Sequence, residues 1–201
     1  GLQETAIIIN ASPADKEKKP ASQGKVSPWN EVRIVDSSGK DVPIGTIGEV
    51  VARSTSGTSA YFKNEQKTKE AFKDGWFHTE DLGYFDEDGY LFLSGRLKDM
   101  IVTGGQNVFA ADVENTILAH PDIADCAVIG LPDEKWGEIV TAVVVRKPNT
   151  AAMEKDVISF CKDKISGFKV PKKIFFQEGP LPRTPTGKVQ KFILVNKFSE
   201  Q

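Results

Sequence analysis

The rhythm of apolar and turn-forming residues changes about halfway along the chain, and this change limits the folds open to it. Between residues 31 and 95, short apolar runs alternate with turns rich in glycine and aspartate, a pattern typical of a small barrel or sandwich of strands. After residue 98, apolar strands alternate with amphipathic helical segments. The sequence therefore predicts an α+β fold in two parts, a β-barrel-like part over 1–97 and a small α+β domain over 98–201.

Periodicity, helix caps and turn residues place the individual elements. Asn64 is a plausible helix cap, and residues 36–40 and 103–105 indicate hairpin turns. The polar stretch 10–25 is predicted to be a surface loop, and Trp136 is expected in the core. We expect strands at 5–9, 31–35, 48–52, 75–79, 83–85, 90–93, 99–102, 106–109, 123–129, 140–145 and 173–177, and helices at 63–72, 112–120, 153–165 and 191–198.

Composition excludes several classes of protein. The 201 residues are 39% hydrophobic and 27% charged, with a formal net charge of −2, which is typical of a globular protein and argues against a nucleic-acid partner. No run reaches the roughly 18 apolar residues of a spanning helix, so no membrane span is expected. Cys126 and Cys161 lack metal-ligand spacing and, without a secretory signal, indicate reduced thiols in a cytoplasmic protein. A start at Gly1 rather than methionine favours a piece of a larger protein.

The stretch PLPRTPTGKV at residues 180–189 is the most informative local signal. Its prolines and glycine exclude a helix interior or a central strand, so it must be a shaped loop. Lys188 near its end could bring a mobile positive charge to a phosphate. A linker that carries a solvated lysine is the alternative.

Other stretches carry weaker signals of the same kind. Asp81 could accept hydrogen bonds from both hydroxyls of a ribose, and a turn-capping aspartate is the alternative. Gly104 and Gly105 permit close approach by a slim ligand, or form a plain hairpin. Arg96 and Lys98 stand where the two sequence patterns join, which indicates either a hinge or an exposed linker.

Together these stretches resemble one family. The segments GLQET (1–5), DGWFHTEDLG (74–83), GRLKDMI (95–101), GGQNV (104–108) and PRTPTGKVQK (182–191) are similar, in this order, to motifs of the adenylate-forming superfamily. That superfamily comprises acyl-CoA synthetases, adenylation domains of peptide synthetases, and luciferases. The resemblance covers essentially the whole chain. It implies that 1–97 is the end of a large N-terminal domain and that 98–201 is a small, mobile C-terminal domain.

The resemblance implies an acid–thiol ligase. Such an enzyme uses ATP and Mg²⁺ to convert a small-molecule carboxylic acid into an acyl-adenylate, and then passes the acyl group to coenzyme A after a rotation of the C-terminal domain. The GGQNV hairpin resembles fatty- and aryl-acid CoA ligases, so a fatty acid is expected. The phosphate loop and acid pocket of the family would precede residue 1, so this chain alone is expected to be inactive. An enzyme that loads a carrier protein and a non-catalytic interaction module are the alternatives.

Site roles carry over by resemblance, residue by residue. Two positions depart from the family pattern: Gln3 stands where threonine is common, and Glu80 replaces the glycine of Thr-Gly-Asp, which adds a carboxylate beside Asp81. The implied site consists of the catalytic Lys188; Gln3, Asp81 and Arg96 at the nucleotide; Glu4 at Mg²⁺; Lys98 and Asp99 at the hinge; and Gly104 and Gly105 in the coenzyme A tunnel.

Overall fold

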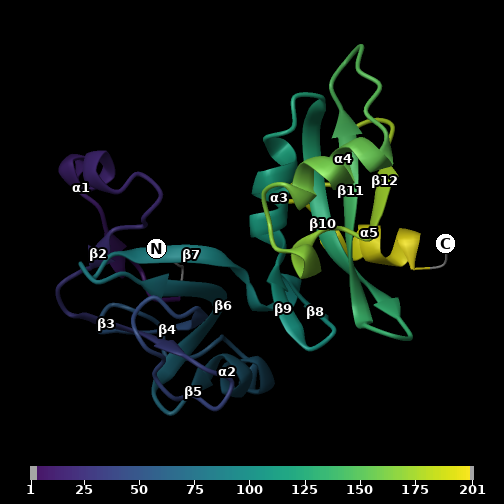
Figure 1. Cartoon of the computed structure of the whole chain (residues 1–201). Coiled ribbons are helices and arrows are strands. Elements are labelled where there is room, and N and C mark those ends of the chain that lie inside the picture. The colour runs from purple at the N-terminus through teal and green to yellow at the C-terminus, as the bar shows by residue number, and fades with distance from the viewer. Residues whose placement is uncertain (1–3, 200–201) are drawn as a thin grey trace. The chain divides into compact units, whose positions relative to one another are not determined.

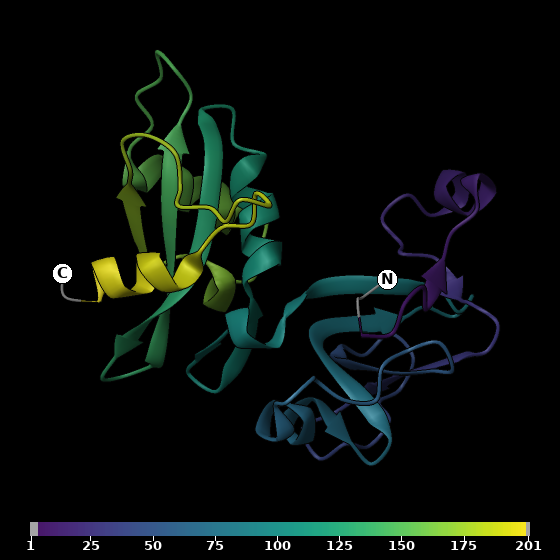
Figure 2. The same cartoon turned by 180° about the vertical axis from the view of Figure 1, so that it is seen from behind.

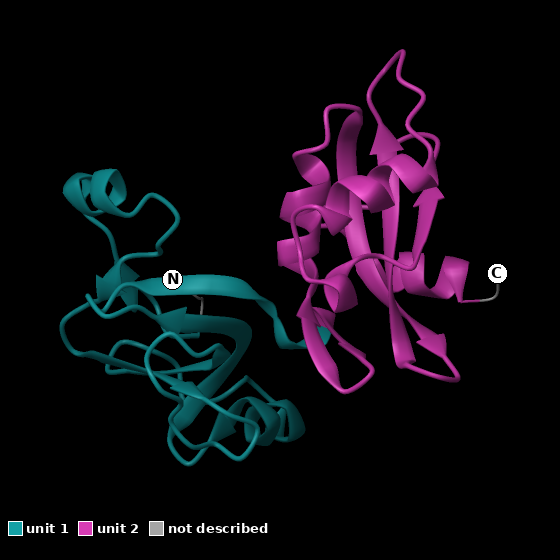
Figure 3. Ribbon diagram, in the orientation of Figure 1, with its two compact units in different colours: residues 1–98 teal, residues 99–201 magenta. Residues whose placement is uncertain are grey.

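The computed structural model describes residues 4–199 (Figure 1). The chain divides into two compact units, Gly1–Lys98 and Asp99–Gln201, which are coloured separately in Figure 3 and are described one at a time. Both units combine strands with helices, so the α+β fold class is confirmed. No helix among the described residues is long and apolar enough to cross a membrane.

Unit 1 is built on an antiparallel sheet of five strands with the order β3-β4-β6-β5, in which β7 pairs with the second half of β6. Within residues 4–98 the sheet is open, with no closed barrel. Its core contains Ile34, Val50 and Leu91, which come from three different strands. The strands are β3 (Asn30–Val35), β4 (Gly48–Ser54), β5 (Phe72–Lys73), β6 (Trp76–Phe85) and β7 (Leu91–Arg96).

Local signals in unit 1 give the expected elements in most places. The turn at 36–40 closes through a hydrogen bond from Asp36 N to Lys40 O at 2.8 Å. Helix α2 (Glu65–Ala71) begins after Asn64, whose Oδ1 accepts a hydrogen bond from Lys67 N at 3.0 Å, as the cap prediction requires. The two strands predicted within 75–85 are one continuous strand, β6.

The N-terminal segment differs from its prediction. The strand expected at 5–9 is reduced to β1 (Ile9–Asn10), which pairs with β2 (Lys25–Val26), and Ile7 is 69% exposed. The predicted loop contains the short helix α1 (Pro13–Lys18), which a reciprocal Ser12–Asp15 capping box begins. This capping box is a sequence signal that the polar composition of 10–25 concealed.

Unit 2 has a five-stranded sheet with the order β10-β11-β8-β9, to which β12 adds as a parallel neighbour of β11. Strands β10 and β11 form a long antiparallel hairpin in which Cys126 faces Val144. Strands β8 and β9 form the hairpin that the glycine pair predicts. The strands are β8 (Met100–Thr103), β9 (Gln106–Phe109), β10 (Ile123–Asp133), β11 (Gly137–Arg146) and β12 (Lys173–Phe176).

Helices cover both faces of this second sheet (Figures 1 and 2). Helices α3 (Ala110–Leu118) and α4 (Glu154–Lys162) pack on one face, and α5 (Lys191–Phe198) packs on the other. Each helix buries two apolar side chains four positions apart, as the helical period requires. Because both faces are covered, successive residues of β11 are buried alternately in one core and the other, which explains its continuous apolar run. The helices predicted at 112–120, 153–165 and 191–198 are confirmed.

Candidate functional site

Asp81 and Arg96 lie opposite each other on the neighbouring strands β6 and β7. Arg96 Nε lies 3.2 Å from Asp81 Oδ1. The backbone of Asp81 is held as well, because its N–H donates to the buried Thr79 Oγ1 at 3.0 Å, which in turn donates to Val50 O at 2.7 Å. Strand pairing therefore brings together the carboxylate and the guanidinium that the family resemblance assigns to one ribose.

A bulge in β6 orients this pair. Glu49 faces Leu82, and Val51 faces His78. Between these two pairs β4 advances by two residues whereas β6 advances by four, so β6 contains two extra residues at this point. Such extra residues bend a strand and change the direction of the side chains that follow. Glu80, within the bulge, has a φ of +59°, in the left-handed region that costs a non-glycine residue roughly 1 kcal/mol or more.

Glu49 supports the bulge, a role that the sequence analysis missed. Its Oε1 accepts the Glu80 N–H at 3.2 Å, and its Oε2 lies 2.8 Å from His78 Nδ1. Glu49 comes from β4, 31 residues before Glu80, so no local pattern could reveal the contact. The carboxylates of Glu49, Glu80 and Asp81 thus lie near one another around the bulge in the middle of β6.

A small cavity of about 120 Å³ lies beside Asp81. Its walls include the aliphatic side chains of Ile8, Val50, Leu91 and Leu93. An acidic hydrogen-bond acceptor beside apolar walls is suited to a ligand that has both hydroxyl groups and a flat or apolar part.

Glu4 lies in a second cavity of unit 1, close to the N-terminus of the described chain. Its Oε1 accepts a hydrogen bond from Tyr61 OH at 2.9 Å, and its carbonyl accepts one from Thr58 N at 2.8 Å. Burial, the hydrogen bond to Glu4 and the nearby charge of Glu80 together raise the pKa of Tyr61. Tyr61 therefore remains a neutral hydrogen-bond donor at ordinary pH. Gln3 lies outside the described residues.

Glu4 is the residue that the family resemblance assigns to Mg²⁺. Among residues 4–199, no group of three or more histidine, cysteine or acidic side chains could hold a metal ion. Mg²⁺ commonly takes only one or two carboxylates and completes its shell with water and substrate phosphates. The single carboxylate of Glu4 fits this way of binding Mg²⁺.

Lys98 and Asp99 stand at the point where the chain leaves unit 1 and enters unit 2. They belong to a single 3₁₀ turn, Leu97–Asp99, in which Lys98 is exposed and Asp99 is half-buried. Short 3₁₀ turns of this kind are common connectors between elements.

Gly104 and Gly105 form the turn between β8 and β9, with φ values of +55° and +76°. They serve different purposes. A Cβ added at Gly104 would come within 2.8 Å of the Trp136 ring, whereas one added at Gly105 would meet nothing within 4 Å. Trp136 was expected in the core, yet it is 42% exposed, because it lies over the glycine turn and not within the sheet. The space that Gly104 frees is filled by the indole of Trp136.

Lys188 lies at the end of a short hairpin that follows β12. Arg183 and Val189 pair as an isolated bridge, and Thr184 N donates to Lys188 O at 2.8 Å. Gly187 has a φ of +86°, which the turn requires. The Lys188 side chain is exposed. The shaped loop that the prolines predict is therefore confirmed, and we call residues 183–189 the Lys188 hairpin.

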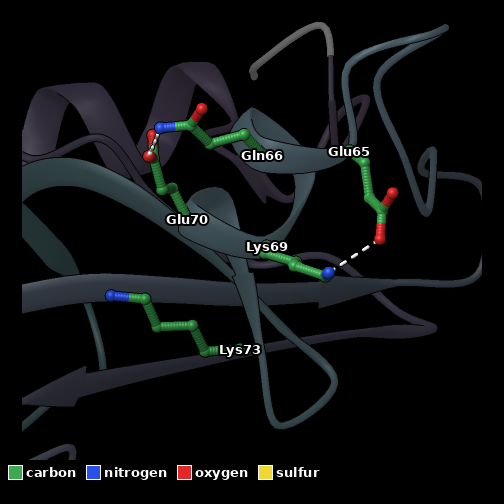
Figure 4. Close-up of a pocket in the computed structure, with 5 residues that line it drawn as sticks. All are labelled: Glu65, Gln66, Lys69, Glu70 and Lys73. Carbon is green, nitrogen blue, oxygen red and sulfur yellow. Dashed lines mark hydrogen bonds and ion pairs between the residues drawn. The ribbon is translucent and has the colours of Figure 1, made fainter.

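The hollow drawn in Figure 4 lies on the exposed face of α2 and is lined by charged residues. Lys69 Nζ lies 2.7 Å from Glu65 Oε1, and Gln66 Nε2 donates to Glu70 Oε1 at 3.0 Å. These pairs are four residues apart, the ordinary stabilising arrangement of a solvated helix. We assign the hollow no ligand.

The two cysteines are free and buried. Burial raises the pKa of both thiols, to about 11 for Cys161 and further still for Cys126. Because the thiolate is the reactive form, neither residue is suited to nucleophilic chemistry. The prediction of unpaired thiols is confirmed.

Two family descriptions match the chain. The one described as AMP-binding enzyme matches residues 1–62, and the one described as AMP-binding enzyme C-terminal domain matches residues 112–188. Among curated proteins, a probable CoA ligase, CCL9, of Humulus lupulus is 42% identical over 100% of this chain and 38% of its own length. The long-chain-fatty-acid–CoA ligase FadD13 of Mycobacterium tuberculosis is 40% identical over 92% of this chain and 36% of its own length.

Solved structures show the same likeness. The ATP-bound MatB of Rhodopseudomonas palustris superposes with a TM-score of 0.91 at 37% identity, covering 100% of this chain and 40% of that one. The o-succinylbenzoate CoA synthetase of Bacillus subtilis, in complex with its acyl-adenylate intermediate, has a TM-score of 0.87 at 32% identity, covering 96% of this chain and 40% of that one. The chain thus spans about two fifths of the length of the proteins it matches.

Proposed function

The chain belongs to the AMP-binding enzyme family and corresponds to the C-terminal portion of its member proteins, and we propose that it is part of an ATP-dependent acid–CoA ligase. The observation that carries this proposal is the pairing of Asp81 with Arg96 on adjacent strands. In the same chain, the second unit presents Lys188 on a shaped hairpin. Named CoA ligases among the relatives support the reaction class.

The proposed nucleotide site uses Asp81, next to the bulge in the middle of β6. Asp81 accepts hydrogen bonds from the two ribose hydroxyls, and Arg96 keeps that carboxylate in place through its ion pair. The aliphatic walls formed by Val50, Leu91 and Leu93 exclude water from one side of the sugar.

The first half-reaction brings two anions together, because the carboxylate of the acid attacks the α-phosphate of ATP. Lys188 is proposed to offset this repulsion as a positive charge that stabilises the transition state. Glu4, oriented by the Tyr61 hydroxyl, would hold Mg²⁺. When bound, the ion supplies charge neutralisation at the phosphates.

The second half-reaction requires the thiol of coenzyme A to approach the adenylate. We propose that unit 2 rotates about Lys98 and Asp99 between the two steps, so that the Gly104–Gly105 turn replaces Lys188 at the site. Gly105, beside which a Cβ would meet nothing within 4 Å, supplies the free space that a pantetheine chain needs, while Gly104 accommodates Trp136.

The acid itself is proposed to be a fatty acid or another medium-to-long acyl acid. The relation to a long-chain-fatty-acid–CoA ligase supports this choice. The predicted cytoplasmic location stays a prediction.

The proposal is tested on the full-length protein that contains this chain. The protein is incubated with ATP, Mg²⁺, CoA and a panel of acids, and acid-dependent pyrophosphate release and soluble acyl-CoA are measured. Both products are expected. Pyrophosphate without a soluble thioester would favour loading of a carrier protein, and the absence of both products would favour a non-catalytic module.

The role of Lys188 is tested by separating the two steps. Lys188→Ala is expected to slow adenylate formation by about 10²–10³-fold, as loss of a transition-state charge contact does. Thioester formation from preformed acyl-adenylate is expected to be nearly unchanged. Lys147→Ala, which removes another exposed lysine of unit 2, is the matched control. An equal loss in both steps would contradict the two-arrangement mechanism.

A further inference from the structure

Two cations, one on each side of Lys188 in the sequence, tie this part of the chain to strand β10 and to helix α3 of unit 2. The first is Arg183 at the start of the hairpin, and the second is Lys191 at the start of α5. Neither residue has an assigned role in the proposed mechanism. We propose that Arg183, anchored by Asp125, is a positioning residue that fixes Lys188 for adenylate formation. This inference rests on the proposed function.

Arg183 joins the hairpin to the sheet with two separate nitrogens. Its Nη1 donates to Gly187 O at 2.7 Å, at the residue immediately before Lys188. Its Nη2 donates to Asp125 Oδ2 at 2.6 Å. A planar guanidinium with a fixed fork can make both bonds at once, which a lysine ammonium on a flexible stem does less well. The carbonyl before Lys188 is therefore held at a set distance from strand β10.

Asp125 is itself fixed. It lies near the start of β10, at a bulge in the pairing with β11, and its Oδ1 accepts the Cys126 N–H at 3.0 Å. One carboxylate thus accepts an N–H at the edge of the sheet and a guanidinium from the hairpin. The two partners are partly exposed, with side-chain accessibilities of 30% for Asp125 and 40% for Arg183.

The second anchor repeats this arrangement. Glu114 Oε1 accepts the Val128 N–H at 2.9 Å and lies 2.7 Å from Lys191 Nζ. Both side chains are more buried than the first pair, at 21% and 18% exposed. The hairpin is therefore held between two ion pairs along one edge of β10. Loss of Arg183 leaves the second anchor in place, which favours local loosening of the hairpin over unfolding of unit 2.

Within the hairpin, backbone bonds transmit this restraint to Lys188. Gly187 N donates to Thr184 O at 2.8 Å, and Lys188 N donates to Thr184 Oγ1 at 3.2 Å. The Lys188 backbone is thus hydrogen-bonded while its side chain is exposed. Because the backbone is already ordered, less conformational entropy is lost when Lys188 takes its position for the reaction.

The kinetic test uses the full-length protein and separates the two half-reactions. Arg183→Ala is expected to slow adenylate formation by about 10- to 100-fold, because a displacement of about 1 Å has that effect on a positioned group. Thioester formation from preformed acyl-adenylate is expected to stay within twofold of the parent. Arg183→Lys should recover only part of the loss. Arg33→Ala serves as the matched control. Arg33 Nε lies 2.6 Å from Asp41 Oδ1 in unit 1, the same distance as between Arg183 and Asp125.

A double variant distinguishes positioning from an independent effect. If Arg183 acts only through Lys188, Arg183→Ala should cause no further loss in a protein that already carries Lys188→Ala. A further loss of the same factor as in the parent protein would overturn the inference, as would equal losses in the two half-reactions for the single variant.

Amide hydrogen exchange tests the restraint without any turnover. In Arg183→Ala, the amides of Gly187 and Lys188 are expected to exchange at least tenfold faster, while those of β11 keep their rates. Unchanged exchange at the hairpin would overturn the inference even if the full-length protein proves inactive. A parent protein that makes no pyrophosphate, together with faster exchange in the variant, would instead contradict only the proposed function.

Discussion

Gly104 and Gly105 are neighbours in one turn, yet different physical demands act on them. Both have positive φ, so any other residue is strained at either position. Only Gly104 is also limited by space, because a Cβ there would lie 2.8 Å from the Trp136 ring. Comparing the two positions therefore separates backbone strain from packing.

Gly105→Ala is expected to lower the free energy of unfolding of unit 2 by about 1 kcal/mol, the strain of a left-handed alanine. Gly104→Ala should lower it by about 1–3 kcal/mol more, the usual effect of overpacking. Urea unfolding followed by Trp136 fluorescence measures both, with Trp29 and Trp76 replaced by phenylalanine. Equal effects of the two substitutions would show that the indole moves aside without cost.

Asp81 is the residue on which the nucleotide assignment depends. In the full-length protein, Asp81→Asn is expected to reduce kcat/KM for ATP by about 10- to 100-fold, since hydrogen bonds to charged groups contribute about 1.5–3 kcal/mol each. The KM for the acid should change little. Asp41→Asn, at the exposed Arg33 pair of the same sheet, is the control. Initial-rate kinetics with varied ATP decide the matter, and an unchanged ATP dependence would remove Asp81 from the nucleotide site.

The sequence motifs pointed to the residues to which we assign direct contact with the substrates. Asp81, Arg96 and Lys188 each stand in a segment whose residue types are unusual enough to notice. Their supports were not visible, because Glu49 contacts Glu80 across 31 positions and Asp125 contacts Arg183 across 58. Such contacts depend on how strands come together, which a local pattern does not record.

At the scale of the element, the segment containing α1 is held by charge and hydrogen bonds, since none of the helix residues is buried. Lys19 pairs with Asp86 and Asp88 in the turn before β7, and Tyr90 OH donates to Asp15 Oδ1 at 2.6 Å. These contacts join positions 67 or more residues apart, which explains why the segment was predicted to be a free loop. In unit 2, by contrast, strands and helices were predictable, because buried side chains recur at the period of each element.

Acid is expected to release α1 before it affects the sheets. The hydrogen bond from Tyr90, and then those from Ser12, lower the pKa of Asp15 from its usual 3.8 to about 2. The folded arrangement favours the ionised form, so its contribution is complete above about pH 4 and is lost as the pH falls through about 2. Amide chemical shifts of residues 14–18 between pH 5 and pH 1.5 should report this transition.

Tyr90→Phe provides the matched control for that titration. It removes the strongest cause of the lowered pKa, so the midpoint of the Asp15 transition should move upward toward 3.8. An unchanged midpoint would mean that Ser12 alone holds the carboxylate.

At the scale of the whole molecule, the two units differ in how completely they bury their apolar side chains. Unit 2 has two extensive clusters, one on each face of its sheet. In the described part of unit 1, the core cluster is smaller and centres on Ile34, Val50 and Leu91. Both units expose large apolar side chains, but the two most exposed, Phe62 at 89% and Trp29 at 86%, belong to unit 1. Exposed apolar surface of this kind promotes association.

Residues 99–201 expressed alone are therefore expected to fold cooperatively and remain monomeric, whereas 1–98 alone should associate. Size-exclusion chromatography with light scattering measures the oligomeric state of both, and thermal unfolding followed by circular dichroism measures cooperativity. Trp29→Ser combined with Phe62→Ser should reduce association of the 1–98 fragment. A monomeric 1–98 fragment would show that its exposed apolar side chains do not cause self-association.

Strand β10 lies at the edge of the sheet in the described part of unit 2, and two of its N–H groups are taken by the carboxylates of Asp125 and Glu114. Those carboxylates are balanced by Arg183 and Lys191, which come from the segment that follows β12. A chain cut before residue 180 would lack both cations and also α5, whose Leu194 and Phe198 cover one face of the sheet, and would leave that apolar face open to other chains. The segment that follows β12 therefore also protects each newly made molecule from its neighbours, and a truncation within it would lead to aggregation as well as to the loss of Lys188.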